Sequence, residues 1–392
     1  MTALRVTPHN NFAELAAHRD CWNQLAAGLP FLEWEWLESW WRHYGHEAGR
    51  LRSGHELLLL AVWEGDQLLG VAPWYLQRTV AYGNVIRFLG SGEVCGDYLS
   101  ILSRPPQARA VDEAIADWLH GCAVGTQNDG MTWDLLELTG VLESELATRG
   151  LAVFMLDRGH WVETVHLMSG WRIPLPQTWE EYVERLSKSH RKNVRRVDRL
   201  LKDNPDYQLR RTATSADFDK NWATLVDLHR RRWQLQGQAG CFESRRFADF
   251  HLEQAQRLLA AGRLELLILD YAGTPIAAEY QFRGAAGMFA YQAGIHPDYL
   301  EHEPGRMVGI AAIQGAISRE EAYYDLLRGD EPYKAHWRAE PRPLVTLRIV
   351  PNRLVSKWRY RWQSTRHSVK RWLKQSWQDW VLATTDTTQF SG

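Results

Sequence analysis

The sequence predicts an α/β protein with two tandem domains followed by a C-terminal helix. Its 392 residues exceed the needs of one core, because a typical domain has about 150 residues. In both halves, segments with helical spacing of apolar residues alternate with short apolar runs typical of strands. Residues 57–76 and 264–282 also share a strand–turn–strand pattern. Any two hairpins share that much, so the repeat supports duplication only weakly.

The composition is that of a globular protein without a dominant charge. Hydrophobic residues make up 45% of the chain and charged residues 24%, which provides enough apolar material for sizeable cores. The formal net charge is −1, from 46 basic and 47 acidic residues. Because no overall field favours nucleic acid or an anionic membrane, we expect no DNA partner, and the charge argues against tRNA.

Cysteine spacing and hydropathy exclude several other classes of protein. The four cysteines are Cys21, Cys95, Cys122 and Cys241. They form no CxxC pair, so we expect neither a zinc site nor a disulfide framework. The longest apolar run, residues 57–63, is far shorter than the ~20 residues of a membrane span. Residues 1–5 lack the features of a secretory signal, and we therefore expect a cytoplasmic protein.

In the first half, two long amphipathic segments precede a series of short strands. We expect helices at residues 11–27, 31–44 and 111–121, a helical turn at 143–149, and strands at 57–62, 68–76, 85–89, 98–102, 133–138 and 152–156. The segment GSGEVCGD, residues 90–97, precedes a strand rather than a helix, so this half is expected to keep its fold without a cofactor. Trp74, Tyr75 and Asp97 are predicted to line the acceptor side of a cleft between the halves.

The second half begins with a strongly basic helix. Thr178 precedes it with Glu181 three residues later, which is the spacing of a capping box. We expect helices at residues 178–203, 217–236, 244–261 and 305–321, and strands at 264–270, 276–283, 288–295, 323–327 and 344–350. A basic, Trp-rich helix at 352–383 ends the chain. We favour its packing on the body, with docking to a membrane surface or to an acidic partner as the alternative.

The most informative segment joins the strand that ends at Ile295 to the helix that opens at Gly305 and Arg306. Helix N-termini present unpaired amides and a partial positive charge, which suits a pyrophosphate. The sequence RMVGIA, residues 306–311, resembles the [QR]-x-x-G-x-[GA] coenzyme A loop of GNAT acyltransferases. The alternative is a helix start in which small residues merely allow close packing.

A second segment makes the resemblance more specific. YDLLRGDEPYKAHW, residues 324–337, resembles the signature of the GNAT subfamily linked to cellulose and exopolysaccharide biosynthesis, which is related to the Fem peptidyltransferases. Residues 187–196, Arg232-Trp233 and the glycines after them agree with it. The resemblance covers residues 171–350 well and the first half only in architecture.

The resemblance implies two tandem GNAT-like domains, each a mixed, mostly antiparallel sheet flanked by helices. We place them at residues 1–165 and 166–350, with a helical tail at 351–392. It further implies acetyl-CoA or another acyl-CoA as donor, a small-molecule or glycan acceptor, and no metal. The cofactor-binding residues would be Ile295, His296, Gly305, Arg306, Met307, Val308, Gly309 and Ala311.

Candidate catalytic and substrate-binding residues come from the polar segments. A base must accept the proton of the attacking amine or hydroxyl, and Asp330, Glu331 and Glu279 are the candidates. The predicted substrate-binding residues are Arg191, Arg195, Arg232, Trp233, Tyr291, Tyr333, Lys334 and Trp337. The competing interpretation of the segment at residues 324–337 is a structural network of ion pairs among Arg328, Asp330 and Lys334.

The favoured function is an acyl-CoA-dependent N- or O-acyltransferase working through a ternary complex. The resemblance implies a role in polysaccharide or cell-envelope biosynthesis. Two alternatives belong to other classes. One is an aminoacyl-tRNA-dependent ligase like the Fem relatives, which the basic helix favours. The other is a non-catalytic GNAT-like scaffold of a polysaccharide-synthesis complex that docks through its tail.

Overall fold

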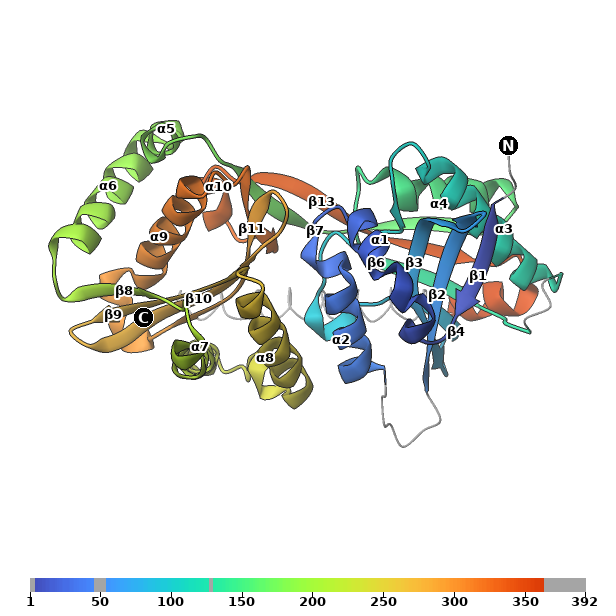
Figure 1. Cartoon of the computed structure of the whole chain (residues 1–392), viewed down its shortest axis with the longest axis horizontal. Coiled ribbons are helices and arrows are strands. Elements are labelled where there is room, and N and C mark those ends of the chain that lie inside the picture. The colour runs from blue at the N-terminus through green and yellow to red at the C-terminus, as the bar shows by residue number, and fades with distance from the viewer. Residues whose placement is uncertain (1–3, 46–53, 127–129, 363–392) are drawn as a thin grey trace, which may run out of the picture.

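A computed structural model describes residues 4–45, 54–126 and 130–362 of the chain. It is a mixed α/β structure built on one 13-stranded sheet that runs through both halves. Figure 1 shows the two halves side by side, with α6 and α9 on one face of the second half and α7 and α8 on the other. The predicted mixed α/β fold is confirmed, and the mixed, mostly antiparallel sheets expected in the two halves are joined in one sheet.

The helices and strands alternate along the chain, and five short 3₁₀ helices occur among them. The first half contains β1 (Arg5–His9), α1 (Arg19–Leu25), α2 (Trp34–Tyr44), β2 (His55–Glu64), β3 (Gln67–Thr79), β4 (Gly83–Phe88), β5 (Leu102–Ser103), α3 (Ala108–Val124), β6 (Leu135–Leu142), α4 (Leu146–Asp157) and β7 (Trp161–Pro174). The second half contains α5 (Trp179–Arg185), α6 (Lys188–Asp203), β8 (Tyr207–Arg211), α7 (Ser215–Leu235), α8 (Arg245–Ala260), β9 (Leu264–Tyr271), β10 (Thr274–Arg283), β11 (Gly287–Ile295), α9 (Pro304–Ser318), β12 (Tyr323–Arg328), α10 (Tyr333–His336) and β13 (Glu340–Val350).

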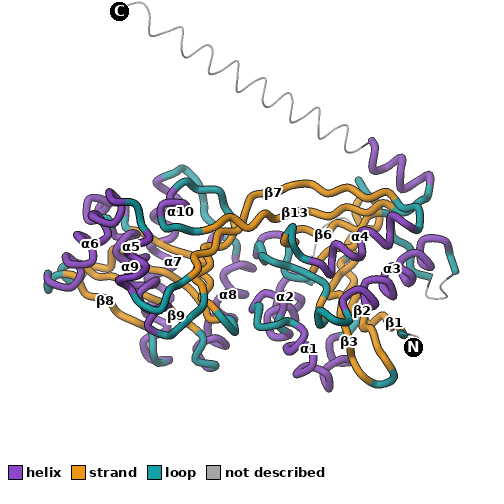
Figure 2. Tube along the Cα trace, turned by 90° about the horizontal axis from the view of Figure 1, so that it is seen from above, coloured by secondary structure: helices purple, strands orange, loops and turns teal. Residues whose placement is uncertain are grey.

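Two long strands, β7 and β13, connect the halves (Figure 2). The strand order is β1-β2-β3-β4-β6-β13-β7-β12-β11-β10-β9-β8, with β5 paired to β3 off this path. β13, which comes last in the sequence, therefore lies between two strands of the first half. β13 pairs with β7 from Glu340↔Arg172 to Val350↔Trp161. The boundary that the sequence suggested, between residues 165 and 166, falls inside β7.

The aromatic core is also continuous between the halves. Phe31 contacts Phe282 with ring centroids 5.6 Å apart, and Trp36 contacts Phe250 at 5.1 Å. Both pairs are edge-on, an arrangement that adds to the gain from burying apolar area. The halves therefore pack against each other through buried side chains as well as through the shared sheet.

Each half contains one pair of parallel strands that separates soon after it forms. β11 pairs with β12 only over residues 287–289 and 323–325. β4 pairs with β6 only at Val85↔Leu135 and Ile86↔Leu136. In the first half, residues 96–99 lie beside this divergence, where the Leu99 amide donates to the Gly140 carbonyl at 3.1 Å.

The start of the basic helix follows the predicted capping chemistry. The Thr178 hydroxyl accepts a hydrogen bond from the Glu181 amide at 3.2 Å. The single helix expected over residues 178–203 is wrong, because α5 ends at Arg185 and Ser187 caps a new helix, α6. Ser187 has extended backbone angles and accepts from the His190 amide. The N-cap Ser187 therefore separates two helices that the spacing of apolar residues had predicted as one.

Two further expectations for the first half need correction, and one long strand was missed. Residues 152–156 form part of helix α4, and not the strand that their apolar run suggested. Of the strand expected at 98–102, only β5 forms, since Tyr98 adopts a left-handed conformation with φ +60°. β7 was not predicted at all. Polar and apolar residues do not alternate regularly along β7, and several of its apolar side chains, including Leu167 and Met168, are exposed.

The described part of the predicted tail helix covers residues 354–362. It packs on the first half through Ser356 and Tyr360, which are buried. Residues 363–383 of the expected helix lie outside the described residues. Within the described part of the chain, no helix is both long and apolar enough to cross a membrane.

Candidate functional site

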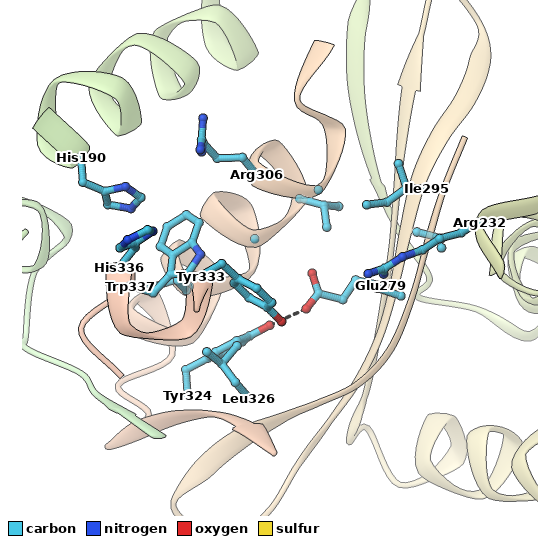
Figure 3. A pocket seen from close by; sticks show the side chains of 17 residues that line it. His190, Arg232, Glu279, Ile295, Arg306, Tyr324, Leu326, Tyr333, His336 and Trp337 are labelled. Atoms are coloured by element: carbon cyan, nitrogen blue, oxygen red, sulfur yellow. Dashed lines mark hydrogen bonds between the residues drawn. The ribbon is translucent and has the colours of Figure 1, made fainter. Parts of the chain in front are cut away.

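A cavity of 340 Å³ opens where β11 and β12 separate, beside the start of α9 (Figure 3). Its walls come from α6, α7, β10, β11, α9, β12 and α10. The lining residues are His190, Arg232, Ala278, Glu279, Ala293, Gly294, Ile295, Gly305, Arg306, Val308, Gly309, Ile313, Tyr324, Leu326, Tyr333, His336 and Trp337. A concave site with a mostly apolar lining and a few converging polar groups is typical of ligand binding.

One carboxylate reaches this cavity from the middle of the sheet. Glu279 on β10 is only 9% exposed, and its Oε1 accepts a hydrogen bond from the Tyr324 hydroxyl at 2.7 Å. Burial raises the pKa of Glu279 from 4.5 to about 7, while the hydrogen bond from Tyr324 acts to lower that pKa. A carboxyl group poised near neutrality is suited to act as a base at physiological pH.

The edge of β11 that faces the cavity is open. On that side, no described strand pairs with residues 290–295, whereas the opposite edge pairs with β10. The β10–β11 register shifts at Tyr291, where a bulge leaves an extra residue in β11. Open amides and carbonyls of this kind can pair with an extended ligand as an added strand does.

Glycines allow the surrounding elements to approach this edge. A Cβ on Gly294 would lie 2.5 Å from the backbone nitrogen of His229, so α7 packs directly against β11 there. A Cβ on Gly305 would lie 2.8 Å from the Cδ1 of Ile295, at the junction of α9 and β11. At Gly309, by contrast, the nearest atom would be Cζ2 of Trp337 at 3.8 Å, which leaves room on the cavity wall.

Helix α9 begins at Pro304, and therefore the predicted coenzyme A loop lies in its first turns. The amides of Arg306 and Met307 donate to the Glu303 carbonyl, and those from Val308 onward lie inside the helix. The Glu303 carboxylate forms ion pairs with Arg306 and with Arg196 of α6. Burial, followed by the nearby Arg196, lowers the pKa of Arg306.

Imidazoles and aromatic rings form another part of the lining. His190 of α6 meets Trp337 edge-on with ring centroids 5.1 Å apart, and the ring of His336 is 6.1 Å away. Burial lowers the pKa of His190, and the charges of Arg306 and His336 add to this effect. His190 is thus held towards its neutral form. Figure 3 shows the two imidazoles away from the Glu279 carboxylate, among the side chains that line the cavity.

A buried lysine fixes the short helix α10, which supplies Tyr333, His336 and Trp337. Lys334 is 2% exposed, and its Nζ donates to the carbonyls of Leu327, Arg328 and Gly329 at 3.2, 3.0 and 3.0 Å. The same Nζ lies 3.0 Å from the Glu331 carboxylate. The lysine thereby ties the turn after β12 to the helix that follows it.

Buried ion pairs connect β12 to the first half of the chain. Asp325 pairs with Arg172 at 2.8 Å and accepts a hydrogen bond from the Tyr98 hydroxyl at 3.0 Å. Arg328 pairs with Asp97. Asp325 and Arg328 are thus directed at the junction between the halves, and only Tyr324 and Leu326 of β12 line the cavity.

Nine of the residues predicted for the site line this cavity. They are Glu279, Ile295, Gly305, Arg306, Val308, Gly309, Arg232, Tyr333 and Trp337. Their functional roles remain predictions.

The other predicted site residues lie outside the lining. Asp330 accepts hydrogen bonds from the Ser169 amide and from Trp171, and the exposed Glu331 pairs with the buried Lys334. Met307 and Ala311 are buried in the packing of α9. His296 accepts from the Asp298 amide, and Arg191 donates to the Glu184 and Leu186 carbonyls. Trp233 donates to His229, and Tyr291 donates to the Val94 carbonyl. Arg195 is exposed to solvent.

Eight lining residues were not among the predicted site residues. They are His190, Ala278, Ala293, Gly294, Ile313, Tyr324, Leu326 and His336. For Tyr324 and Leu326 a signal was present, because residues two apart on a strand share one face. His190 lies on α6, more than 80 residues before the strands it faces, and nothing in its local sequence indicates this contact.

Comparison with known proteins agrees with this geometry. The family described as "Acetyltransferase (GNAT) domain" matches residues 188–335. The crystal structure of FemX superposes with a TM-score of 0.57 at 9% sequence identity, covering 87% of this chain and 96% of that one. A conserved protein of unknown function from Bacteroides thetaiotaomicron gives 0.52 at 12% identity, covering 88% and 100%.

A tandem GNAT protein from the clavulanic acid biosynthesis pathway gives a TM-score of 0.47 at 13% identity, covering 88% of this chain and 98% of that one. No curated protein shows significant sequence similarity to the chain. At such identities the likeness to the first two structures extends to the fold alone. Residues 188–335, which match the GNAT acetyltransferase model, include all the residues that line the cavity except His336 and Trp337.

Proposed function

We propose that the protein is an acyl-CoA-dependent acyltransferase whose acceptor amine or hydroxyl reacts in the cavity beside Glu279. The observation that carries this proposal is the position of the Glu279 carboxyl group. This group belongs to β10 and forms part of the wall of the cavity that opens where β11 and β12 separate. Burial raises its pKa to about 7. By the sequence resemblance, the acceptor is a small molecule or a glycan of polysaccharide or cell-envelope biosynthesis.

The lining fits an acyl-CoA in two respects. The open edge of β11 offers backbone groups to an extended amide-containing arm. Arg306, at the positive end of α9, offers charge to phosphates. The donor would supply an activated thioester, whose acyl C–S bond would break and release the thiolate of coenzyme A as the new amide or ester bond forms. Within the described residues, no group of three or more His, Cys, Asp or Glu is arranged to hold a metal ion.

The chain's own groups account for the remaining chemistry. In its ionised form, Glu279 accepts the proton that the attacking amine or hydroxyl must lose. Tyr324 fixes the orientation of that carboxylate through its hydroxyl. Amides on the open edge of β11 stabilise negative charge that develops on the acyl oxygen. The side chains of Tyr333 and Trp337 reduce access of water to this end of the cavity.

Calorimetric titration of the whole protein with acetyl-CoA tests the proposal. We expect binding by the native protein and its loss in Gly309→Trp, because the indole fills the space between α9 and Trp337. Ser318→Trp is the matched control, since Ser318 is exposed at the other end of α9. Absence of binding by the native protein, or equal binding by both variants, would overturn the proposed donor site.

An aminoacyl-tRNA-dependent ligase is a second candidate, favoured by the fold shared with FemX and by the basic surface of α6. Arg195, Arg196 and Arg199 are exposed on that helix. Binding of tRNA that weakens steeply with added salt would support this candidate. If the native protein binds acetyl-CoA and shows no such tRNA binding, the candidate is eliminated.

A further inference from the structure

The helix at residues 354–362 has one face fixed to the body of the protein. Its buried residues are Ser356 and Tyr360. The Ser356 hydroxyl donates to Asp134 Oδ1 at 2.6 Å, and Arg353 and Arg359 form ion pairs with the same carboxylate at 3.2 and 3.0 Å. Tyr360 donates to Glu163 of β7. Asp134, itself buried, thus holds three side chains and sets how the helix lies on the first half.

The opposite face of this helix is apolar and exposed. Leu354, Val355, Trp358 and Trp362 are each between 56% and 89% exposed. Positions one, four and eight residues after Leu354 fall on one side of a helix, so these side chains form a single stripe. The indoles of Trp358 and Trp362 stack with centroids 6.0 Å apart. Exposure of two large apolar rings to water is unfavourable in free energy. A patch of this kind therefore marks a site that binds another molecule or a membrane.

The charge around this stripe is one-sided. From residue 352 to residue 382 the sequence contains a single acidic residue, Asp379, whereas the whole chain is nearly neutral. The basic residues of this stretch are Arg353, Lys357, Arg359, Arg361, Arg366, Lys370, Arg371 and Lys374. Trp372, Trp377 and Trp380 continue the tryptophan enrichment in the sequence beyond the described residues. The tail thus combines tryptophans with positive charge, which is the composition of helices that lie in a bilayer interface.

We propose that the helix at residues 354–362 binds the surface of an anionic lipid bilayer, while the contacts of Asp134 fix it to the body of the protein. Tryptophan is enriched at the level of lipid headgroups, because its ring is apolar and its N–H is polar. Lysine and arginine beside it are attracted to anionic headgroups. The stripe of Leu354, Val355, Trp358 and Trp362 enters the interface, and the body stays in water. This inference does not depend on the proposed reaction.

Co-sedimentation of the full chain with lipid vesicles tests the proposal. We expect binding to vesicles that contain phosphatidylglycerol and weaker binding to pure phosphatidylcholine, with the difference reduced by salt. The double variant Trp358→Ser, Trp362→Ser removes the stacked indoles, and we expect it to lower the bound fraction about tenfold. Both side chains are exposed, so the thermal midpoint should not change.

The control is Trp161→Ser, because Trp161 is 54% exposed on β7 and lies outside the tail. It should bind vesicles as the native protein does. The proposal is overturned if the native protein ignores both vesicle types, or if the double variant and the control sediment equally. Acetyl-CoA titration of the double variant separates the two proposals. The helix at 354–362 packs on Asp134 and Glu163 of the first half, whereas the cavity is lined by residues 190–337 of the second half, so ligand binding should be equal with or without the indoles.

Discussion

The carboxylate of Asp97 accepts a hydrogen bond from the backbone amide of Arg328 at 2.8 Å and also pairs with the Nε of the same arginine. The two residues belong to different halves of the chain. Asp97 is almost fully buried, and Arg328 also donates to the Gly96 carbonyl at 2.7 Å. The end of β12, which carries Tyr324 into the cavity, is thereby fixed by the first half.

Asp97→Asn tests the weight of this contact. Removing one partner of a buried ion pair typically costs about 3–5 kcal/mol, because the other charge stays buried without compensation. We expect a loss of that size in the free energy of unfolding measured with urea. Glu56→Gln is the control, since the Glu56–Arg78 pair is exposed, and such pairs contribute about 0–1 kcal/mol. Equal losses of unfolding free energy in both variants would show that the Asp97–Arg328 pair stabilises the protein no more than an exposed ion pair does.

Glu279→Gln tests the proposed base through the pH dependence of catalysis. A base works in its deprotonated form, so the rate of the native protein should rise with pH through about 7, the raised pKa of Glu279. The amide variant should lose this rise and turn over about 10²–10⁴-fold more slowly. Tyr324→Phe removes the hydrogen bond that lowers the pKa of Glu279, so its rise should move to higher pH. A profile unchanged in Tyr324→Phe would contradict this assignment.

The same carboxyl group makes a prediction for stability that is independent of activity. Its pKa is about 7 in the folded protein against 4.5 otherwise, so between these values the folded state holds a proton that the unfolded state has lost. The free energy of unfolding should therefore fall as pH rises through this window, by about 3 kcal/mol in total. Urea unfolding at pH values below and above the window measures the change. Glu279→Gln should flatten it, and an equally steep fall in that variant would place its origin elsewhere.

Lys334→Met tests the anchoring of α10. The substitution keeps most of the buried volume but leaves the carbonyls of residues 327, 328 and 329 without their donor. An unsatisfied buried polar group costs about 1–3 kcal/mol, so we expect a clear loss of unfolding free energy together with weaker ligand binding. Lys202→Met is the control, because Lys202 is exposed and pairs only with Asp198 four residues away. Equal free energies of unfolding in the two variants would show that Lys334 does not stabilise the turn after β12.

Elements with strong local signals could be predicted, and those that depend on distant partners could not. The hairpin of β2 and β3 and the cap at Thr178 are encoded within a few residues, and both are confirmed. The apolar run at residues 152–156 is compatible with a strand or a buried helix, and α4 forms because one face packs on α3 while Val153 and Leu156 stay exposed. β7 depends on pairing with β13, almost 180 residues later, and its own sequence gives little sign of it.

The candidate site shows the same division. The glycines of α9 and the strand ending at Ile295 are local features, and sequence reasoning placed them together, as the structure does. Asp330 was chosen for its charge, yet it binds the Ser169 amide on β7, a contact set by the sheet order. For Glu279 the sequence indicated a carboxylate on a strand, but its burial and its contact with Tyr324 arise only when β10 and β12 fold around the same cavity.

The position of β13 between β6 and β7 also constrains how the protein is made. A ribosome releases residues 135–174 long before residues 340–350, so β6 and β7 emerge without the strand that joins them. The first half therefore cannot complete its sheet before residues 340–350 have emerged, although N-terminal domains commonly fold before later parts of the chain are made. The sheet that joins the halves is complete only once residues 340–350 are available, and β6 and β7 of a nascent chain arrested before residue 340 should be more sensitive to proteases than in the whole protein.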